Sequence, residues 1–598
     1  MNFSSLRSLI HAMSIAVALG SPGSAKAAAD LAARLEAQNA LLAEQWEWQL
    51  KENPEFATIL GDDRYNDRWS DYAPEHFAKQ KQDLEHFLAR FEAIDPAGFP
   101  EPDRLNRELM LRKLRDALDG LAFKNYEMPL DQFNGVHLQL PQLVSVLPLD
   151  SLKHYADYLA RLHRIPALLD QVAQLARLGQ RDGLMPPQYL LEKVARQCRA
   201  IAQPAGEANV FGRPAVQIPQ TLPAAERQRL HDAIVAAVDR EVRPAYARLA
   251  DFVEKDYAPH GRRAPGLWAL PDGPARYRYA IRTQTTTAMD PEAIHELGLK
   301  EVARIEGEMT AIAKKLGYAD LAGLRAALKS ERKYYASSRQ QIVDLYRKYI
   351  AQMQPRLPEL FGLLPKAPVE VRPMQEYREK EAAAAEYQQG TADGSRPGIV
   401  YVNTGDYAQR SLVTIEDTAY HEGVPGHHLQ IAIAQTLPLP PFRQQADYTA
   451  YIEGWALYAE RLGKDLGFYQ DPVSDYGRLA GELLRASRLV LDTGVHDKRW
   501  TREQMIAFFR AHTVEDEPDI QAETDRYIAM PAQALAYKLG QLKFLELRAR
   551  AQRVLGEKFD LRAFHDEMLG GGALPLDVLE TRFDAWLEAQ RAKAANAG

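Results

Sequence analysis

Apolar residues recur at intervals of three and four along most of the chain, and this spacing constrains the fold more than any other feature. In residues 30–51, Leu31, Leu35, Leu41 and Leu42 follow the pattern of an amphipathic helix. Similar patterns occupy residues 76–94, 104–120, 151–180, 225–257, 292–317 and 338–363. Stretches rich in proline and glycine separate them. The sequence therefore predicts a mostly α-helical fold.

Two segments interrupt the helical pattern. Residues 366–374 alternate around Val369 and Val371, and residues 398–405 are apolar and β-branched. The segment between them is rich in turn-forming residues. We expect a small sheet or hairpin here. We divide the chain near residue 285, into an N-terminal helical scaffold (28–285) and a region that carries the chemistry (286–598).

The N-terminus has the pattern of a signal peptide over residues 1–27. Arg7 supplies a positive charge, Leu9 to Leu19 a short apolar run, and Ala25-Lys26-Ala27 a cleavage site before Ala28. A disordered or helical extension is the alternative. We expect a periplasmic or secreted protein. No cysteine lies near the cleavage site, so we expect no lipid-anchored mature form.

Composition narrows the possible partners. The 598-residue chain has a formal net charge of −7 and no basic run, so we expect no nucleic-acid partner. No stretch has the roughly 18 apolar residues of a membrane span. Cys198, the single cysteine, cannot form an internal disulfide and is expected to pack as a small core residue.

The sharpest chemical signal is a histidine pattern at residues 414–435. Zinc sites need imidazole or carboxylate ligands that converge on one point, and the usual helical pattern is HExxH. Here His421-Glu422 is followed by His427 and His428. In a straight helix, a residue six positions on points about 120° away, and one seven on lies about 10 Å along the axis. Neither histidine could then share a metal with His421.

The residues between His421 and His427 can interrupt the helix. Pro425 lacks a backbone donor, and Gly423 and Gly426 allow conformations that other residues resist. The chain can therefore bulge and resume a helix near His427, which would bring His427 or His428 to the metal. The alternative is a solvent-facing turn rich in histidine at a helix end.

A third ligand is expected from the apolar helical stretch at residues 447–463. Glu453 and Glu460 are seven residues apart and share one face of it. A buried carboxylate is costly unless it is paired or binds a metal. Glu453 is thus the expected third ligand. Glu460 would accept a hydrogen bond behind a ligand or pair with a basic residue.

The segments HEGVPGHHLQ and YIEGWALYAE resemble a bacterial domain-of-unknown-function family with the motif HExxPGHHxQ. That family is grouped with the gluzincin metallopeptidases, which are zincin-like and resemble neurolysin and thermostable carboxypeptidase. The resemblance covers nearly the whole mature chain and is most specific at residues 396–550. It implies a mostly helical, neurolysin-like zincin with a small β-sheet beside the metal-binding helix.

The resemblance also implies roles for particular residues. It places His421, His427 and Glu453 as zinc ligands, favours His427 over His428, and makes Glu422 the general base. In the gluzincins, a tyrosine on a late helix stabilises the oxyanion. Tyr537 is the first choice for this role, with Tyr527 second. An edge strand beside the metal-binding helix can hold a peptide by strand addition.

Residues 485–500 place Arg485, Arg488, Asp492 and His496 at helical spacings of three and four. Such a stripe can bind a substrate carboxylate through arginine or form a buried ion-pair network. Arg488 and Tyr527 are taken as substrate-binding residues and His496 as a catalytic one. Asp417, four residues before His421, would accept a hydrogen bond from it or lie on the surface.

These features predict a zinc-dependent hydrolase that cleaves short peptides, with Glu422 as general base. Two other functions fit the same pattern. A catalytically silent binding protein could keep a zincin-like shell, although the retained Glu422 argues against it. A zinc amidase could act on non-peptide amides.

Overall fold

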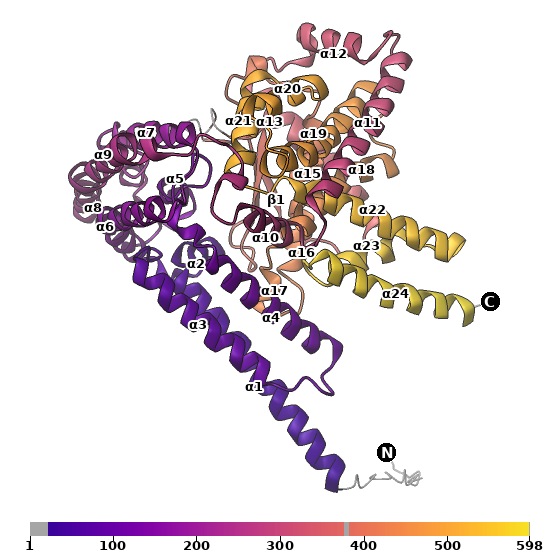
Figure 1. Ribbon diagram of the computed structural model, residues 1–598, viewed down its shortest axis with the longest axis horizontal. Helices are drawn as coiled ribbons and strands as arrows, with labels where there is room; N and C mark the ends of the chain where they lie inside the picture. Colours follow the sequence, from indigo (N-terminus) through magenta and orange to yellow (C-terminus); the bar gives the residue numbers. More distant parts are fainter. Residues whose placement is uncertain (1–21, 376–378, 380–381, 597–598) are drawn as a thin grey trace, which may run out of the picture.

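The structure, a computed structural model, describes residues 22–375, 379 and 382–596. Most of the predicted signal peptide lies outside the described residues, and residues 22–27 begin the first helix. The chain is mostly helical, as predicted (Figure 1). No helix within the described ranges is long and apolar enough to cross a membrane.

The N-terminal helices belong to two different cores. Leu41 of α1, Leu84 of α3 and Leu109 of α4 share a buried cluster with Ile415 and Trp455 near the predicted metal residues. These helices and their neighbours are α1 (Pro22–Glu52), α2 (Pro54–Leu60), α3 (Pro74–Ala93), α4 (Glu101–Ala122) and α5 (Val136–Leu143).

A second core lies entirely within residues 130–258. Cys198 is fully buried in it, which confirms its predicted role. The helices of this part are α6 (Leu152–Asp182), α7 (Gln188–Ala202), α8 (Ala224–Ala237) and α9 (Arg243–Phe252), which gather at one end of the molecule in Figure 1. The division of the chain near residue 285 stays a prediction.

The small sheet consists of β1 (Val369–Pro373), β2 (Ala385–Gln388) and β3 (Gly398–Val402), in the order β1-β3-β2. β3 runs parallel to β1 and antiparallel to β2, and all five of its residues are buried. The prediction of extended segments at 366–374 and 398–405 is confirmed. The segment between them, which the sequence predicts to be rich in turns, also contains a strand, because residues 385–388 pair with β3.

The remaining helices surround this sheet and form the main body. Between residue 273 and the sheet lie α10 (Gly273–Thr285), α11 (Pro291–Lys315), α12 (Leu321–Ser330), α13 (Arg339–Met353) and α14 (Leu357–Leu360). After the sheet come α15 (Ile415–Glu422), α16 (His427–Ala434), α17 (Pro441–Gln444), α18 (Thr449–Asp465), α19 (Pro472–His496), α20 (Arg502–His512), α21 (Glu517–Ala529), α22 (Leu535–Leu555), α23 (Leu561–Gly570) and α24 (Leu576–Asn596).

Two glycines allow α18 and α22 to pack closely. A Cβ at Gly540 would lie 1.9 Å from the carbonyl oxygen of Ala450, and one at Gly454 would lie 2.4 Å from the Cα of Gly540. Larger side chains would force the helices apart. This contact holds Glu453, beside Gly454, close to the helix that carries Tyr537.

Candidate metal centre

The histidine pattern spans a break between two short helices. α15 ends at Glu422, and α16 begins at His427. The amide of Gly426 donates to the carbonyl of Tyr420 (2.9 Å). The predicted bulge and return to helix are thus confirmed.

Close packing around the break explains its sequence. A Cβ at Gly426 would lie 1.9 Å from the carbonyl oxygen of His421, so only glycine fits there. The indole Nε1 of the buried Trp455 donates to the carbonyl of Pro425 (3.0 Å) and ties the break to α18. The interruption therefore has a defined shape, which sets His427 relative to His421.

Three side chains converge at this place. The Nε2 atoms of His421 and His427 lie 3.6 and 3.4 Å from Oε2 of Glu453. One ligand atom from each of these residues lies within 4.8 Å of the others. The two distances to Glu453 exceed the usual length of a hydrogen bond. Oε2 of Glu453 and Nδ1 of His427 are buried and have no hydrogen-bond partner among the described residues.

This arrangement fits a metal ion better than a bonded triad. Around a tetrahedral Zn²⁺ with ligands at about 2.0–2.1 Å, neighbouring ligand atoms lie roughly 3.3 Å apart. The separations of 3.4 and 3.6 Å are close to that value. A metal cation between the three ligand atoms would satisfy Oε2 of Glu453, a buried atom without a hydrogen-bond partner among the described residues. The residues present therefore fit a zinc ion.

Glu460 orients the first histidine. Nδ1–H of His421 donates to Oε1 of Glu460 (2.8 Å), which leaves Nε2 directed towards Glu453. Glu460 is buried, and Oε1 also lies 3.9 Å from Nη2 of Arg485. Both predicted roles of Glu460 therefore occur together.

Asp417 does not have the position expected for it. Glu460, not Asp417, accepts the hydrogen bond from His421, and Asp417 is only 1% exposed, so it is not a surface residue. Burial, together with the charge of Glu460, raises the pKa of Asp417 well above its usual range. The sequence placed Asp417 on the correct helical face but could not show that His421 turns Nδ1 towards α18.

The charges of the group depend on one another. Burial favours the neutral form of His421, but the carboxylates of Glu453 and Glu460 outweigh it and raise the pKa of His421 to about 9. Burial likewise opposes ionisation of Glu453, yet the two imidazoles hold its pKa well below the usual range. A zinc ion bound to Nε2 of His421 would thus displace a proton from that ring.

His428 faces away from this group. Its Nε2–H donates to the carbonyl of Ala367 (3.1 Å), and its Nδ1 accepts from the Tyr387 hydroxyl of β2 (3.1 Å). Burial lowers the pKa of His428 to about 4, so the ring is neutral and both nitrogens are in use. Of the two candidates, the structure brings His427 to the group and uses His428 to attach α16 to the sheet.

Glu422 and Tyr537 border the group. Glu422 is partly exposed at the end of α15, and its carboxylate has no hydrogen bond or ion pair with another described residue. The ring of Tyr537 stacks nearly parallel to that of His421, with 6.5 Å between the centroids. The carboxylate of Glu422 and the ring of Tyr537 thus lie near His421.

Arg488 and Tyr527 are buried next to each other, and the guanidinium of Arg488 lies over the ring of Tyr537. Nε of Arg488 donates to the Tyr527 hydroxyl (2.8 Å), and Nη2 donates to Glu523 (2.8 Å). Tyr527 donates to the same carboxylate (2.6 Å) and is 1% exposed. Nε and Nη2 of Arg488 and the hydroxyl of Tyr527 are thus bonded to protein groups, whereas Nη1 of Arg488 is buried without a hydrogen-bond partner among the described residues. Substrate binding by these two residues stays a prediction.

His496 is also placed elsewhere. Its Nδ1 accepts from the amide of Leu267 (3.1 Å), and its Nε2–H donates to the carbonyl of Tyr527 (3.0 Å). Burial lowers the pKa of His496 to about 3. With both nitrogens bonded to backbone, the ring cannot take the predicted catalytic role. Asp492 similarly accepts from Tyr277 and from the amide of Ala532.

No sequence pattern indicated that Arg526 and Glu523 lie beside Tyr537. Nη2 of Arg526 donates to the hydroxyl of Tyr537 (3.1 Å), and Nη1 donates to Glu523 (3.3 Å). Arg526 lies on α21 and Tyr537 on α22, with a turn between them. The turn between the two helices interrupts the helical period, so only the fold brings the two side chains together.

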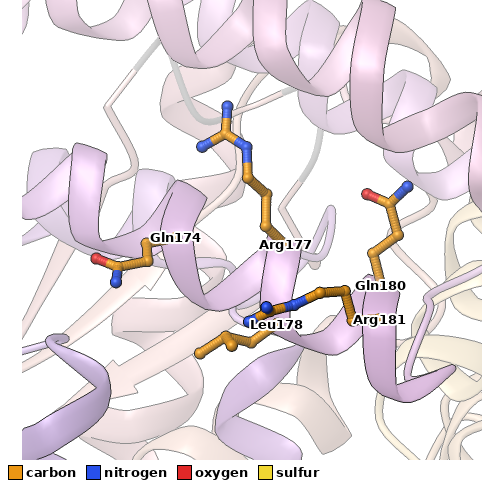
Figure 2. Close-up of a pocket in the computed structure, with 5 residues that line it drawn as sticks. All are labelled: Gln174, Arg177, Leu178, Gln180 and Arg181. Carbon is orange, nitrogen blue, oxygen red and sulfur yellow. The ribbon is translucent and has the colours of Figure 1, made fainter.

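A surface hollow elsewhere shares no residue with this centre. Figure 2 shows it on α6, where it is lined by Gln174, Arg177, Leu178, Gln180 and Arg181. All five come from one helix, and none is a carboxylate or a histidine. The chemistry suggested by the sequence is therefore concentrated at α15, α16 and α18.

The fold and the site define a mostly helical protein with a buried His-His-Glu group beside a small sheet. The family model described as "Bacterial protein of unknown function (DUF885)" matches residues 54–583, and the chain belongs to this family.

Solved structures share the fold. A candidate lipoprotein from Colwellia psychrerythraea is 30% identical, with a TM-score of 0.89, and the match covers 93% of this chain and 99% of that one. A candidate lipoprotein of unknown function from Shewanella oneidensis is 18% identical, with a TM-score of 0.67 and coverage of 91% and 98%. No curated protein matches the chain.

Proposed function

We propose that this protein is a zinc-dependent metallopeptidase of the gluzincin type that hydrolyses short peptides. One observation carries the proposal: Nε2 of His421, Nε2 of His427 and Oε2 of Glu453 face one another at separations suited to a shared metal. The resemblance of the motif to gluzincins supports a neurolysin-like fold and a peptide substrate.

The ligand set suits catalysis as well as binding. Two histidines and one glutamate leave a fourth position open, as in catalytic zinc sites. When bound, Zn²⁺ supplies a Lewis acid that polarises a carbonyl group and lowers the pKa of a water molecule towards about 7. A purely structural site usually has four protein ligands.

The neighbouring side chains supply the remaining chemistry. Glu422, adjacent to His421 and free of ion pairs with the described residues, takes a proton from water and passes it to the leaving amine. Tyr537 donates a hydrogen bond to the oxyanion that forms at the scissile carbonyl. Glu460 holds His421 in the tautomer that presents Nε2.

Export is part of the same proposal. The N-terminal pattern of residues 1–27 is that of a signal peptide, and two relatives of known structure are described as candidate lipoproteins. A periplasmic or secreted enzyme would encounter short peptides from nutrients or the cell wall.

The test compares the zinc-loaded protein with Glu422→Gln on a mixed peptide library, with cleavage sites determined by mass spectrometry. We expect cleavage by the wild type and a decrease of about 10² or more in the variant, which should keep its zinc. Equal rates for both proteins would exclude Glu422 as the base. Zinc binding without any cleavage would favour the binding protein, and cleavage of non-peptide amides alone would favour the amidase.

A further inference from the structure

We infer that Arg526 positions the hydroxyl of Tyr537, turning its proton towards the reacting carbonyl. This inference rests on the proposed hydrolysis and assigns a role to a residue outside the metal group. Arg526 does not touch the substrate and acts through Tyr537.

The ring of Tyr537 is buried between neighbouring side chains. It lies nearly parallel to the ring of His421, at 18° and 6.5 Å between centroids. The guanidinium carbon of Arg488 lies 4.4 Å from the Tyr537 centroid, a cation–π contact. Tyr537 is only 6% exposed. Packing thus sets the position of the Tyr537 ring, and hydrogen bonds set the direction of its O–H bond.

Two donors occupy the acceptor side of the phenol oxygen. Nη2 of Arg526 donates to Oη of Tyr537 (3.1 Å), and Nε2 of Gln533 lies at 3.4 Å. Nη2 of Arg526 also donates to Oε1 of Gln533 (3.0 Å), which fixes the amide orientation. A guanidinium has no acceptor, so the proton of Tyr537 cannot point at Arg526. Within the described chain, no group accepts that proton.

A shared carboxylate holds the arginine in place. Oε1 of Glu523 accepts from Nη1 of Arg526 (3.3 Å), and Oε2 accepts from Nη2 of Arg488 (2.8 Å). Burial raises the pKa of Glu523, but the two arginines outweigh it and lower that pKa to about 2. Arg488 and Arg526 therefore share the carboxylate of Glu523, which holds both guanidinium groups beside Tyr537. A guanidinium that donates to the phenol oxygen strengthens the hydrogen bond that the Tyr537 hydroxyl gives to a developing anion.

The test is a double-mutant cycle with Arg526→Gln and Tyr537→Phe, measured on the best-cleaved peptide. Loss of an oxyanion donor typically lowers kcat by about 10²–10³-fold, so we expect a large loss in Tyr537→Phe. Arg526→Gln should lower kcat by at least tenfold with little change in KM, and by less than twofold in the Tyr537→Phe background. Arg510→Gln serves as the matched control, because Arg510 forms an exposed ion pair with Glu517 on the surface.

A second readout does not depend on turnover. An alanine-containing dipeptide phosphonate, which carries a tetrahedral anion, should bind zinc-loaded wild type at least tenfold more tightly than either variant by calorimetry. All variants should keep their zinc.

The outcomes separate the two proposals. If Arg526→Gln lowers kcat by the same factor in both backgrounds, Arg526 does not act through Tyr537. Absence of phosphonate binding to the wild type, or equal binding by the wild type and Tyr537→Phe, overturns the inference whether or not peptides are cleaved. Loss of cleavage in Glu422→Gln together with additive Arg526 and Tyr537 effects would leave the proposed function intact and remove only this inference.

Discussion

The substitution Gly426→Ala tests how the break between α15 and α16 builds the metal site. The new Cβ would lie 1.9 Å from the carbonyl oxygen of His421 and 2.5 Å from that of Tyr420, whereas such contacts below 3.0 Å are essentially never observed. Both contacts involve backbone, which cannot rotate away as a side chain can. The chain must therefore shift by about 1 Å beside His427, while metal–ligand distances tolerate only about 0.2 Å.

We expect Gly426→Ala to weaken zinc binding more than 100-fold, beyond the usual effect of an outer hydrogen-bond partner. A competition titration against a chromogenic chelator measures this affinity, with circular dichroism as a check on folding. Gly307→Ala in α11 is the matched control, because a Cβ there meets nothing within 4 Å. It should keep zinc and gain up to about 1 kcal/mol of stability. A folded Gly426→Ala protein with wild-type zinc affinity would refute the reasoning.

Four further substitutions probe single side chains. His427→Ala should lose stoichiometric zinc in elemental analysis, whereas His428→Ala should keep it and lose about 1–3 kcal/mol of unfolding free energy; the reverse pattern would exchange their roles. Glu460→Gln should lower zinc affinity about 10–100-fold, because His421 loses its charged acceptor, and unchanged affinity would remove that role. Burial raises the pKa of Asp492 to about 7, so the unfolded chain ionises this carboxyl at lower pH than the folded one. Its contribution to stability should fall between about pH 4 and 7: relative to Asp492→Asn, the wild type should lose about 3 kcal/mol from pH 5 to pH 8 in denaturant titrations, and parallel curves would contradict this.

Much of the fold could be predicted because it follows local periods. Apolar spacing identified the helical segments, and β-branched alternation identified β1 and β3. The sequence pattern did not reveal β2, because its four residues precede a turn-rich stretch. They form a strand only by pairing with β3, about ten residues further along the chain. The inclusion of α1, α3 and α4 in the main core likewise depends on long-range packing that no local pattern encodes.

Part of the candidate site could likewise be predicted from the sequence, and part depends on the fold. His421, His427 and Glu453 could be predicted because a metal needs convergent ligands, and Pro425 and the glycines indicated the break. The choice between the two histidines followed from the resemblance, not from spacing. The sequence does not show in which direction Nδ1 of His421 points. Glu460, rather than Asp417, accepts its hydrogen bond because Nδ1 faces α18.

The helical face formed by Arg485, Arg488, Asp492 and His496 could be predicted only in part. A helical face was predicted correctly, yet the structure uses Arg488, Asp492 and His496 to bind neighbouring side chains and backbone groups inside the protein. Spacing shows which residues share a face, but it does not show what that face meets. Arg526, which contacts Tyr537 across a turn, lies outside any such pattern.

Anomalous diffraction at the zinc edge from a crystal of the zinc-loaded protein tests the central claim most directly. We expect one strong peak within about 2.0–2.2 Å of Nε2 of His421, Nε2 of His427 and a carboxylate oxygen of Glu453. Absence of a peak at full zinc loading, or a peak bound by other residues, would contradict the account.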